Sequence, residues 1–85
     1  MNQLEKAIVR LKLLPKDYTY SEARALLFRL GFNEYTKGKT SGSRVKFYRA
    51  SDGFIILLHK PHPGDQMSLG ATKALKAVLE RNGDI

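Results

Sequence analysis

The chain is organised around the stretch Gly38-Lys39-Thr40-Ser41-Gly42-Ser43-Arg44-Val45-Lys46-Phe47-Tyr48. It begins as a small, glycine-punctuated turn and continues as a segment in which basic or polar residues alternate with apolar ones. Successive side chains of a strand point to opposite faces, so Arg44 and Lys46 share one face and Val45 and Phe47 the other. The pattern predicts a strand that offers a basic face to an acidic partner.

One further strand is predicted before this one in the chain and one after it. Residues 32–37 have a period of two and end at Gly38, and the strand with the basic face covers residues 43–50. Ser51-Asp52-Gly53 is typical of a hairpin turn, and the apolar run of residues 54–59 after it suits a central strand.

The hairpin turn also predicts a register. If Asp52-Gly53 is a two-residue loop, Lys46 lies opposite His59. One face of the hairpin then carries Arg44, Lys46, Tyr48 and His59, and the other carries Val45, Phe47, Ile56 and Leu58. A slip of one residue would exchange the faces of one strand.

Three helices are predicted around the strands. Asn2 is an N-cap for a first helix with an apolar stripe of Leu4, Ala7, Ile8 and Leu11, which Pro15 ends. The residues from Thr19 to Glu22 form a capping box before a second helix that ends at Gly31. Ser68 caps the last helix, whose stripe is Leu75, Val78 and Leu79, with Ala71 and Ala74 as close-packing positions, and Asn82-Gly83 closes it.

The order of these elements predicts the fold class. We expect a single α+β domain over residues 1–85, with a three-stranded antiparallel sheet and helices on one of its faces. Without the first helix, over residues 1–14, the order is α-β-β-β-α, as in the double-stranded-RNA-binding domain. This order alone does not establish a function.

Composition favours a nucleic acid as partner. The chain has 85 residues and a formal net charge of +7, a field that attracts polyanions. Between residues 37 and 60 the only acid is Asp52, against the cations Lys37, Lys39, Arg44, Lys46, Arg49 and Lys60. The sequence contains no cysteine and no apolar run long enough to span a bilayer. We expect a cytoplasmic protein without a membrane partner.

The histidines are the candidates for acid–base chemistry. His59 and His62 are the only two in the chain; His59 precedes a proline-rich loop over residues 60–65, and His62 lies within it. RNA cleaves itself when a base takes the 2′-OH proton, an acid protonates the leaving oxygen and a cation stabilises the phosphate. A structural role for both histidines is the simpler alternative. No third ligand accompanies them at metal-binding spacing, so we expect neither a metal nor another cofactor.

Four segments together resemble the HicA family. They are Leu30-Gly31-Phe32, the stretch from Ser41 to Phe47, Leu58-His59-Lys60-Pro61-His62-Pro63, and the closing Asn82-Gly83. HicA proteins are toxins of bacterial toxin–antitoxin pairs, regarded as ribosome-independent mRNA interferases. The resemblance covers roughly Thr19 to Ile85, so the first helix looks like an extension. It implies an α-β-β-β-α fold, mRNA as substrate and the antitoxin HicB as partner.

One departure from the family concerns catalysis. HicA proteins typically carry Gly-Ser-His with a catalytic histidine, whereas this chain has Gly42-Ser43-Arg44. An arginine makes a poor base but a good phosphate ligand. Either His62 or His59 has therefore taken over proton transfer, or the protein binds RNA without cutting it efficiently. A third reading is a protein-interaction domain. The predicted RNA-binding residues are Lys37, Lys39, Arg44, Lys46 and Lys60.

Overall fold

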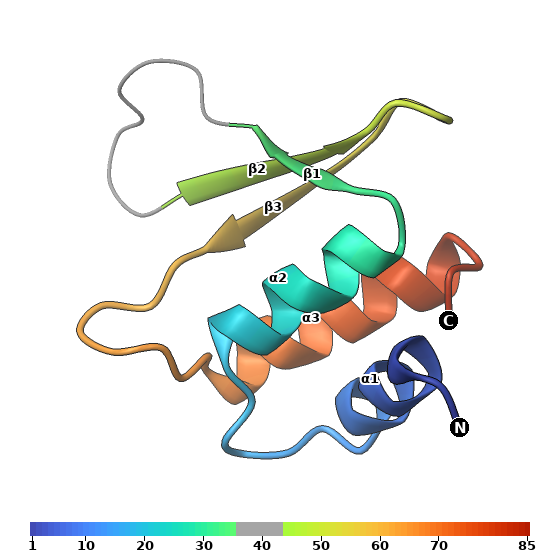
Figure 1. Ribbon diagram of the computed structural model, residues 1–85. Coiled ribbons are helices and arrows are strands. Elements are labelled where there is room, and N and C mark those ends of the chain that lie inside the picture. The colour runs from blue at the N-terminus through green and yellow to red at the C-terminus, as the bar shows by residue number, and fades with distance from the viewer. Residues whose placement is uncertain (36–43) are drawn as a thin grey trace.

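The computed structural model describes residues 1–35 and 44–85 (Figure 1). The elements run in the order α1 (Gln3–Lys12), α2 (Tyr20–Arg29), β1 (Asn33–Tyr35), β2 (Arg44–Arg49), β3 (Phe54–His59) and α3 (Leu69–Arg81). The strands form one antiparallel sheet in the order β1-β2-β3. The α+β class is confirmed, and the bounds of β3 are those predicted. The prediction that residues 54–59 suit a central strand is wrong, because β1 and β3 both pair with β2 and β3 lies at an edge. The predicted end of β1, at residues 36–37, lies outside the described residues.

The helices begin and end where local sequence signals place them. Asn2 and Thr19 each accept a hydrogen bond from the backbone of a glutamate three residues on, whose carboxylate accepts one from the cap in return. Ser68 caps α3 by accepting from the backbone N–H of Ala71. Gly31 follows α2 with φ of 95°, a left-handed conformation that glycine adopts at low cost. The predicted helices and caps are confirmed.

The β2–β3 register differs from the prediction, whereas the assignment of faces is right. Lys46 lies opposite Leu57, and His59 lies opposite Arg44. The loop takes residues 50–53, and the backbone N–H of Gly53 donates to the carbonyl of Arg49 at 2.8 Å. The longer loop displaces β3 by two residues relative to the predicted pairing. A displacement of two keeps every side chain on its face, because the period of a strand is two.

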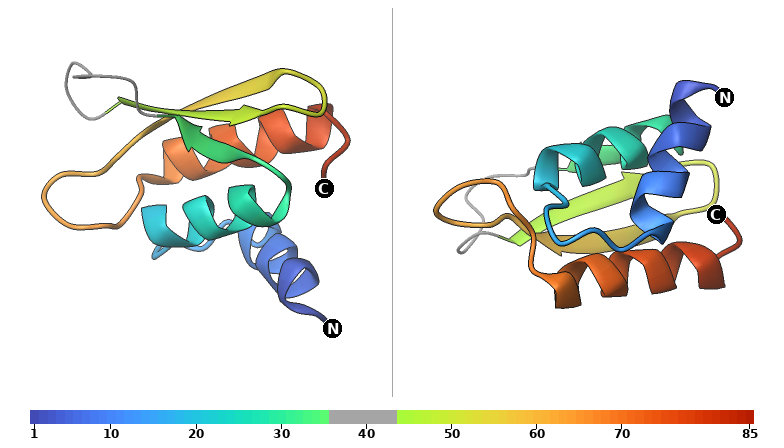
Figure 2. Two further views of the ribbon diagram at one scale, coloured as in Figure 1. Left: turned by 45° about the horizontal axis from the view of Figure 1, so that its top comes forward. Right: turned by 90° about the horizontal axis from the view of Figure 1, so that it is seen from below.

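The helices all lie on one side of the sheet (Figures 1 and 2). On that inner face Phe47, Ile56 and Leu58 are buried, as are Leu26 and Leu27 of α2 and Leu75 and Leu79 of α3. Helix α1 lies on the side of α2 and α3 away from the sheet, and its Leu11 is fully buried. In α3, Ala71 is half-buried but Ala74 is exposed, so only the first of the predicted close-packing alanines contacts the core.

The segment after β3 returns to the helical side of the molecule. The Asp65 carbonyl accepts from the backbone N–H of Tyr20 at 2.7 Å, and the Met67 N–H donates to the Tyr18 carbonyl at 2.8 Å. Met67 is buried against the core. These bonds join the end of the proline-rich loop to the first residue of α2 and to the segment just before it. Over the described ranges, no helix is long and apolar enough to cross a membrane.

Candidate nucleic-acid interface

The outer face of the sheet carries no helix and exposes basic, aromatic and aliphatic side chains together. The register arranges its residues in rows across the strands, because partners on adjacent strands lie side by side. The rows are Arg44 with His59, then Tyr35 with Lys46 and Leu57, then Asn33 with Tyr48 and Ile55. Of these, Lys46 is half-buried and the others are exposed.

The first row joins a cation and a histidine. Arg44 of β2 and His59 of β3 are direct cross-strand partners. Directly opposed residues have Cβ atoms about 4.5–5.5 Å apart. The row therefore places a side chain suited to proton transfer next to one suited to binding phosphate. The predicted register would have placed His59 beside Lys46 instead.

Lys46 connects the first row to two exposed tyrosines. Its ammonium lies 5.1 Å from the centroid of the Tyr35 ring, within the range of a cation–π contact. Tyr35, Lys46, Tyr48 and Ile55 line a shallow hollow of about 240 Å³. The sequence predicts Tyr48 on this face but not as a binding residue, and Tyr35 is not among the predicted site residues. The strand alternation of residues 32–37 was a signal for Tyr35.

No acid lies on the outer face of the described sheet. All eight acids of the sequence are in the described ranges, and each accepts a hydrogen bond or forms an ion pair elsewhere. Glu34, the one acid of β1, points inward, where it pairs with Arg24 at 2.8 Å and accepts from the Tyr20 hydroxyl at 3.4 Å. Because nothing on the outer face offsets Arg44 and Lys46, that face attracts anions.

Arg49, counted in the sequence among the clustered cations, has a structural role. Its side chain is 10% exposed and lies on the inner face. The guanidinium donates to Asp52 and to Asp84, each at 2.8 Å, and to the Leu30 carbonyl at 3.0 Å. It also lies 4.4 Å from the centroid of the Phe32 ring. These contacts close the far end of the sheet onto the C-terminus and leave Arg49 unable to reach a ligand on the outer face.

The remaining predicted site residues do not join the outer face. Lys60 is exposed, and its ammonium lies 6.0 Å from the centroid of the Tyr20 ring, toward the helical side. His62 is exposed in the loop that returns toward α2, and among the described residues nothing contacts its side chain through a hydrogen bond or ion pair. Lys37 and Lys39 lie outside the described residues. The structure thus brings together Arg44, Lys46 and His59 only.

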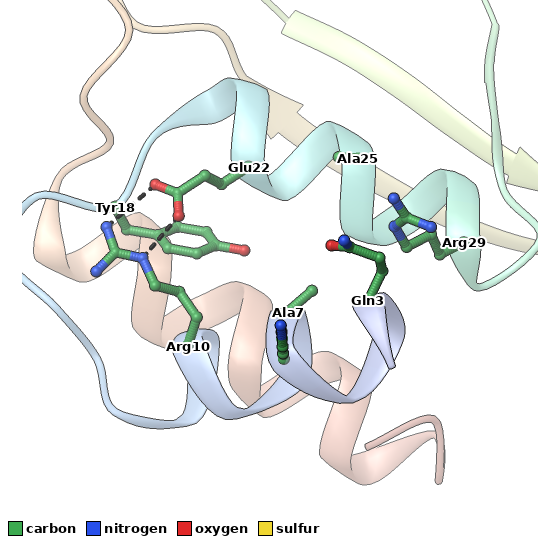
Figure 3. A pocket seen from close by; sticks show the side chains of 8 residues that line it. Gln3, Ala7, Arg10, Tyr18, Glu22, Ala25 and Arg29 are labelled. Carbon is green, nitrogen blue, oxygen red and sulfur yellow. Dashed lines mark hydrogen bonds and ion pairs between the residues drawn. The ribbon is translucent and has the colours of Figure 1, made fainter. Parts of the chain in front are cut away.

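A second hollow, of about 300 Å³, lies between α1 and α2 (Figure 3). On one side of it, Arg10 pairs with Glu22 at 2.6 Å and with Asp17 at 3.1 Å. The Arg10 hydrogen bond lowers the pKa of Glu22, and burial raises the pKa of Tyr18 to about 12, so its hydroxyl stays protonated. Arg10 thus joins α1 to α2 through Glu22, which is typical of a contact that holds two helices together.

In the ranges 1–35 and 44–85, no cluster of three or more histidine, cysteine, aspartate or glutamate side chains is arranged to hold an ion. No protein-family model matches the chain, and neither a curated protein nor a solved structure is significantly similar to it.

Proposed function

We propose that this protein binds RNA on the outer face of its sheet and cleaves it without a metal, as a toxin of the HicA type. The observation that carries the proposal is the pairing of His59 with Arg44 on an exposed face that has no acid. It combines a group that transfers protons near neutral pH with a cation that binds phosphate.

The chemistry assigned to this pair is the attack of a ribose 2′-OH on the adjacent phosphorus. His59 takes the 2′-OH proton as the new P–O bond forms. The P–O bond to the next ribose then breaks, and its 5′-oxygen takes a proton from water, to which His59 returns the proton it took. The products are a 2′,3′-cyclic phosphate and a 5′-OH. Arg44 and Lys46 hold the phosphate and stabilise the charge that develops on its oxygens. His62 is the second candidate for proton transfer, from the neighbouring loop.

The biological setting of the proposal follows from the family resemblance. We propose a fold of the double-stranded-RNA-binding-domain type, preceded by α1. In this setting the protein acts in the cytoplasm, inhibits translation by cutting mRNA and is neutralised by a HicB-like antitoxin. An adjacent gene for a HicB-like protein would support this setting without testing the chemistry.

The test is RNA cleavage by the purified protein in EDTA, with four variants. His59→Ala is expected to lower the cleavage rate by about 10²-fold or more, as for loss of a general acid or base. His62→Ala tests the second candidate for proton transfer and is expected to lower the rate less than His59→Ala does, and Arg44→Ala is expected to weaken RNA binding as well as cleavage. Arg44→His restores the Gly-Ser-His pattern and is expected to raise the rate. Intact RNA with the wild type, or full activity of His59→Ala, would contradict the proposal.

A second candidate function, RNA binding without cleavage, is favoured by Arg44 itself. An arginine stands where the family pattern has its catalytic residue, and an arginine side chain does not act as a base. This alternative predicts salt-sensitive binding with no fragments. Loss of each phosphate contact would then lower the salt slope by about 0.7 for a single strand. If Arg44→Ala combined with Lys46→Ala leaves RNA binding unchanged, the face serves an acidic protein partner instead.

A further inference from the structure

Two tyrosines stand exposed on the outer face without a structural reason for their exposure. Tyr35 is 45% exposed and Tyr48 is 39% exposed, and neither is covered, because every helix lies on the opposite face (Figure 2). Tyr20, by contrast, is buried under the sheet, where it packs near Phe47 and donates to Glu34. An exposed aromatic ring on a sheet provides a flat surface on which a nucleic-acid base can stack.

The two rings are positioned as neighbours. Tyr35 lies directly across from Lys46, and Tyr48 follows Lys46 by two residues on the same face. Diagonal neighbours of this kind are about 7–8 Å apart across a strand pair. The Lys46 ammonium lies over Tyr35, so a base on that ring would have a cation beside it. Two successive nucleotides of one extended strand can reach both rings.

We infer that the outer face takes unpaired RNA, with bases stacked on Tyr35 and Tyr48 and the backbone running toward Arg44. The inference rests on the RNA-binding half of the proposed function and names the class of RNA. A duplex keeps its base faces inside its own stack and offers a protein mainly phosphates and 2′-hydroxyls. A face that combines aromatic rings with cations and lacks acids matches a single strand, which exposes both bases and phosphates.

The tyrosines lie next to the residues to which we assign the cleavage chemistry. Arg44 precedes Lys46 by two residues on β2, so the Arg44–His59 row is adjacent to the Tyr35–Lys46 row. A base stacked on Tyr35 places the neighbouring phosphate over Arg44 and its 2′-OH within reach of His59. Ile55 and Leu57 are exposed beside the rings and extend the apolar floor. The stacked bases thereby position the backbone for the cut.

The experiment measures the affinity of the full chain for three probes by fluorescence anisotropy. The probes are an unpaired 2′-O-methyl RNA of on the order of ten nucleotides, the same strand annealed to its complement, and inorganic polyphosphate. The 2′-O-methyl group prevents cleavage, and polyphosphate carries charge without bases. The variants are Tyr35→Leu with Tyr48→Leu, Tyr35→Phe with Tyr48→Phe, and Arg44→Ala with Lys46→Ala. Thermal unfolding confirms that each variant folds.

The wild type is expected to bind the unpaired strand more tightly than the duplex. The leucine variant should lose about tenfold in affinity for the unpaired strand for each tyrosine, while the phenylalanine variant retains it, because stacking needs the ring and not the hydroxyl. The leucine variant and the phenylalanine variant should bind polyphosphate with the same affinity, because polyphosphate has no bases. The arginine–lysine variant should weaken binding of all three probes, because it removes phosphate contacts.

Different outcomes would overturn the stacking inference and the proposed function. If the leucine variant binds the unpaired strand as the wild type does, or the duplex binds as well as the single strand, the stacking inference is overturned and the RNA-binding face stands. If the arginine–lysine variant also binds RNA normally, or the wild type binds neither RNA, the proposed function fails with it.

Discussion

Strand β2 has an arginine at each end, and the two differ in their contacts and in their exposure to solvent. Arg49, on the inner face, is fixed by two carboxylates, a backbone carbonyl and an aromatic ring. Arg44, on the outer face, is exposed opposite His59, and within the described ranges it has no ion-pair partner. The strand alternation separates them, because they are an odd number of residues apart. A cluster of cations in a sequence therefore contains both structural and binding residues.

The largest expected effect on stability comes from removing the Arg49 side chain. Arg49→Ala leaves Asp84, whose side chain is 15% exposed, without its partner and deprives the Leu30 carbonyl of a donor. Loss of one partner of a buried pair costs about 3–5 kcal/mol, and we expect the free energy of unfolding to fall by about the lower figure because Asp52 is half-exposed. Urea denaturation measures this fall in the free energy of unfolding.

Arg44→Ala is the matched control on the same strand. An exposed substitution of this kind changes stability by about 0.5 kcal/mol or less. The variant should unfold like the wild type and fail only in RNA binding. Equal destabilisation by the two substitutions would show that the two ends of β2 do not differ in the way described.

A smaller effect on stability is expected from changing Asp84, one of the two acids that pair with Arg49. The Arg49 hydrogen bond holds the pKa of Asp84 below its ordinary value of 3.8. The folded state therefore binds this proton less tightly than the unfolded state does. The stability from the pair is fully present above the ordinary pKa and is lost as the pH falls through the lowered pKa of the folded state. Asp84→Asn should cost about 2 kcal/mol at neutral pH and flatten the loss of stability below about pH 4.

Asp17→Asn serves as the control for this prediction. The Asp17 side chain is 76% exposed and pairs with Arg10 at 3.1 Å. Exposed pairs contribute at most about 1 kcal/mol. Acid unfolding followed by circular dichroism compares the two variants, and an Asp84→Asn protein with the acid sensitivity of the wild type would exclude the Arg49 pair as its source.

Local signals in the sequence were sufficient for the helices and for the faces of the strands. The caps at Asn2, Thr19 and Ser68 depend on residues three positions apart, and the faces of β2 depend on alternation alone. The register was wrong by two residues because the Asp52-Gly53 signal does not specify loop length. Asp52 binds Arg49 and the Phe54 N–H, which favours the longer loop, and the first of these contacts was not visible in the sequence.

The candidate site was predicted only in part for the same reason. Arg44, Lys46 and His59 were assigned to one face correctly, but the pairing of His59 with Arg44 required the register. The role of Arg49 required Asp84, a residue 35 positions away in the chain. The return of the loop after β3 toward Tyr18 and Tyr20 likewise depends on long-range backbone bonds, so the position of His62 was not accessible from local patterns.

The central claim, that RNA binds the outer and not the inner face, is tested most directly on β3. Ile55 and Leu57 are exposed on the outer face, whereas their neighbours Ile56 and Leu58 are buried on the inner face. The strand thus carries an isoleucine and a leucine on each side. Nuclear magnetic resonance of methyl-labelled protein titrated with unpaired 2′-O-methyl RNA should shift the methyl signals of Ile55 and Leu57 and leave those of Ile56 and Leu58 in place. Shifts confined to the buried pair or to helix methyls would contradict the account.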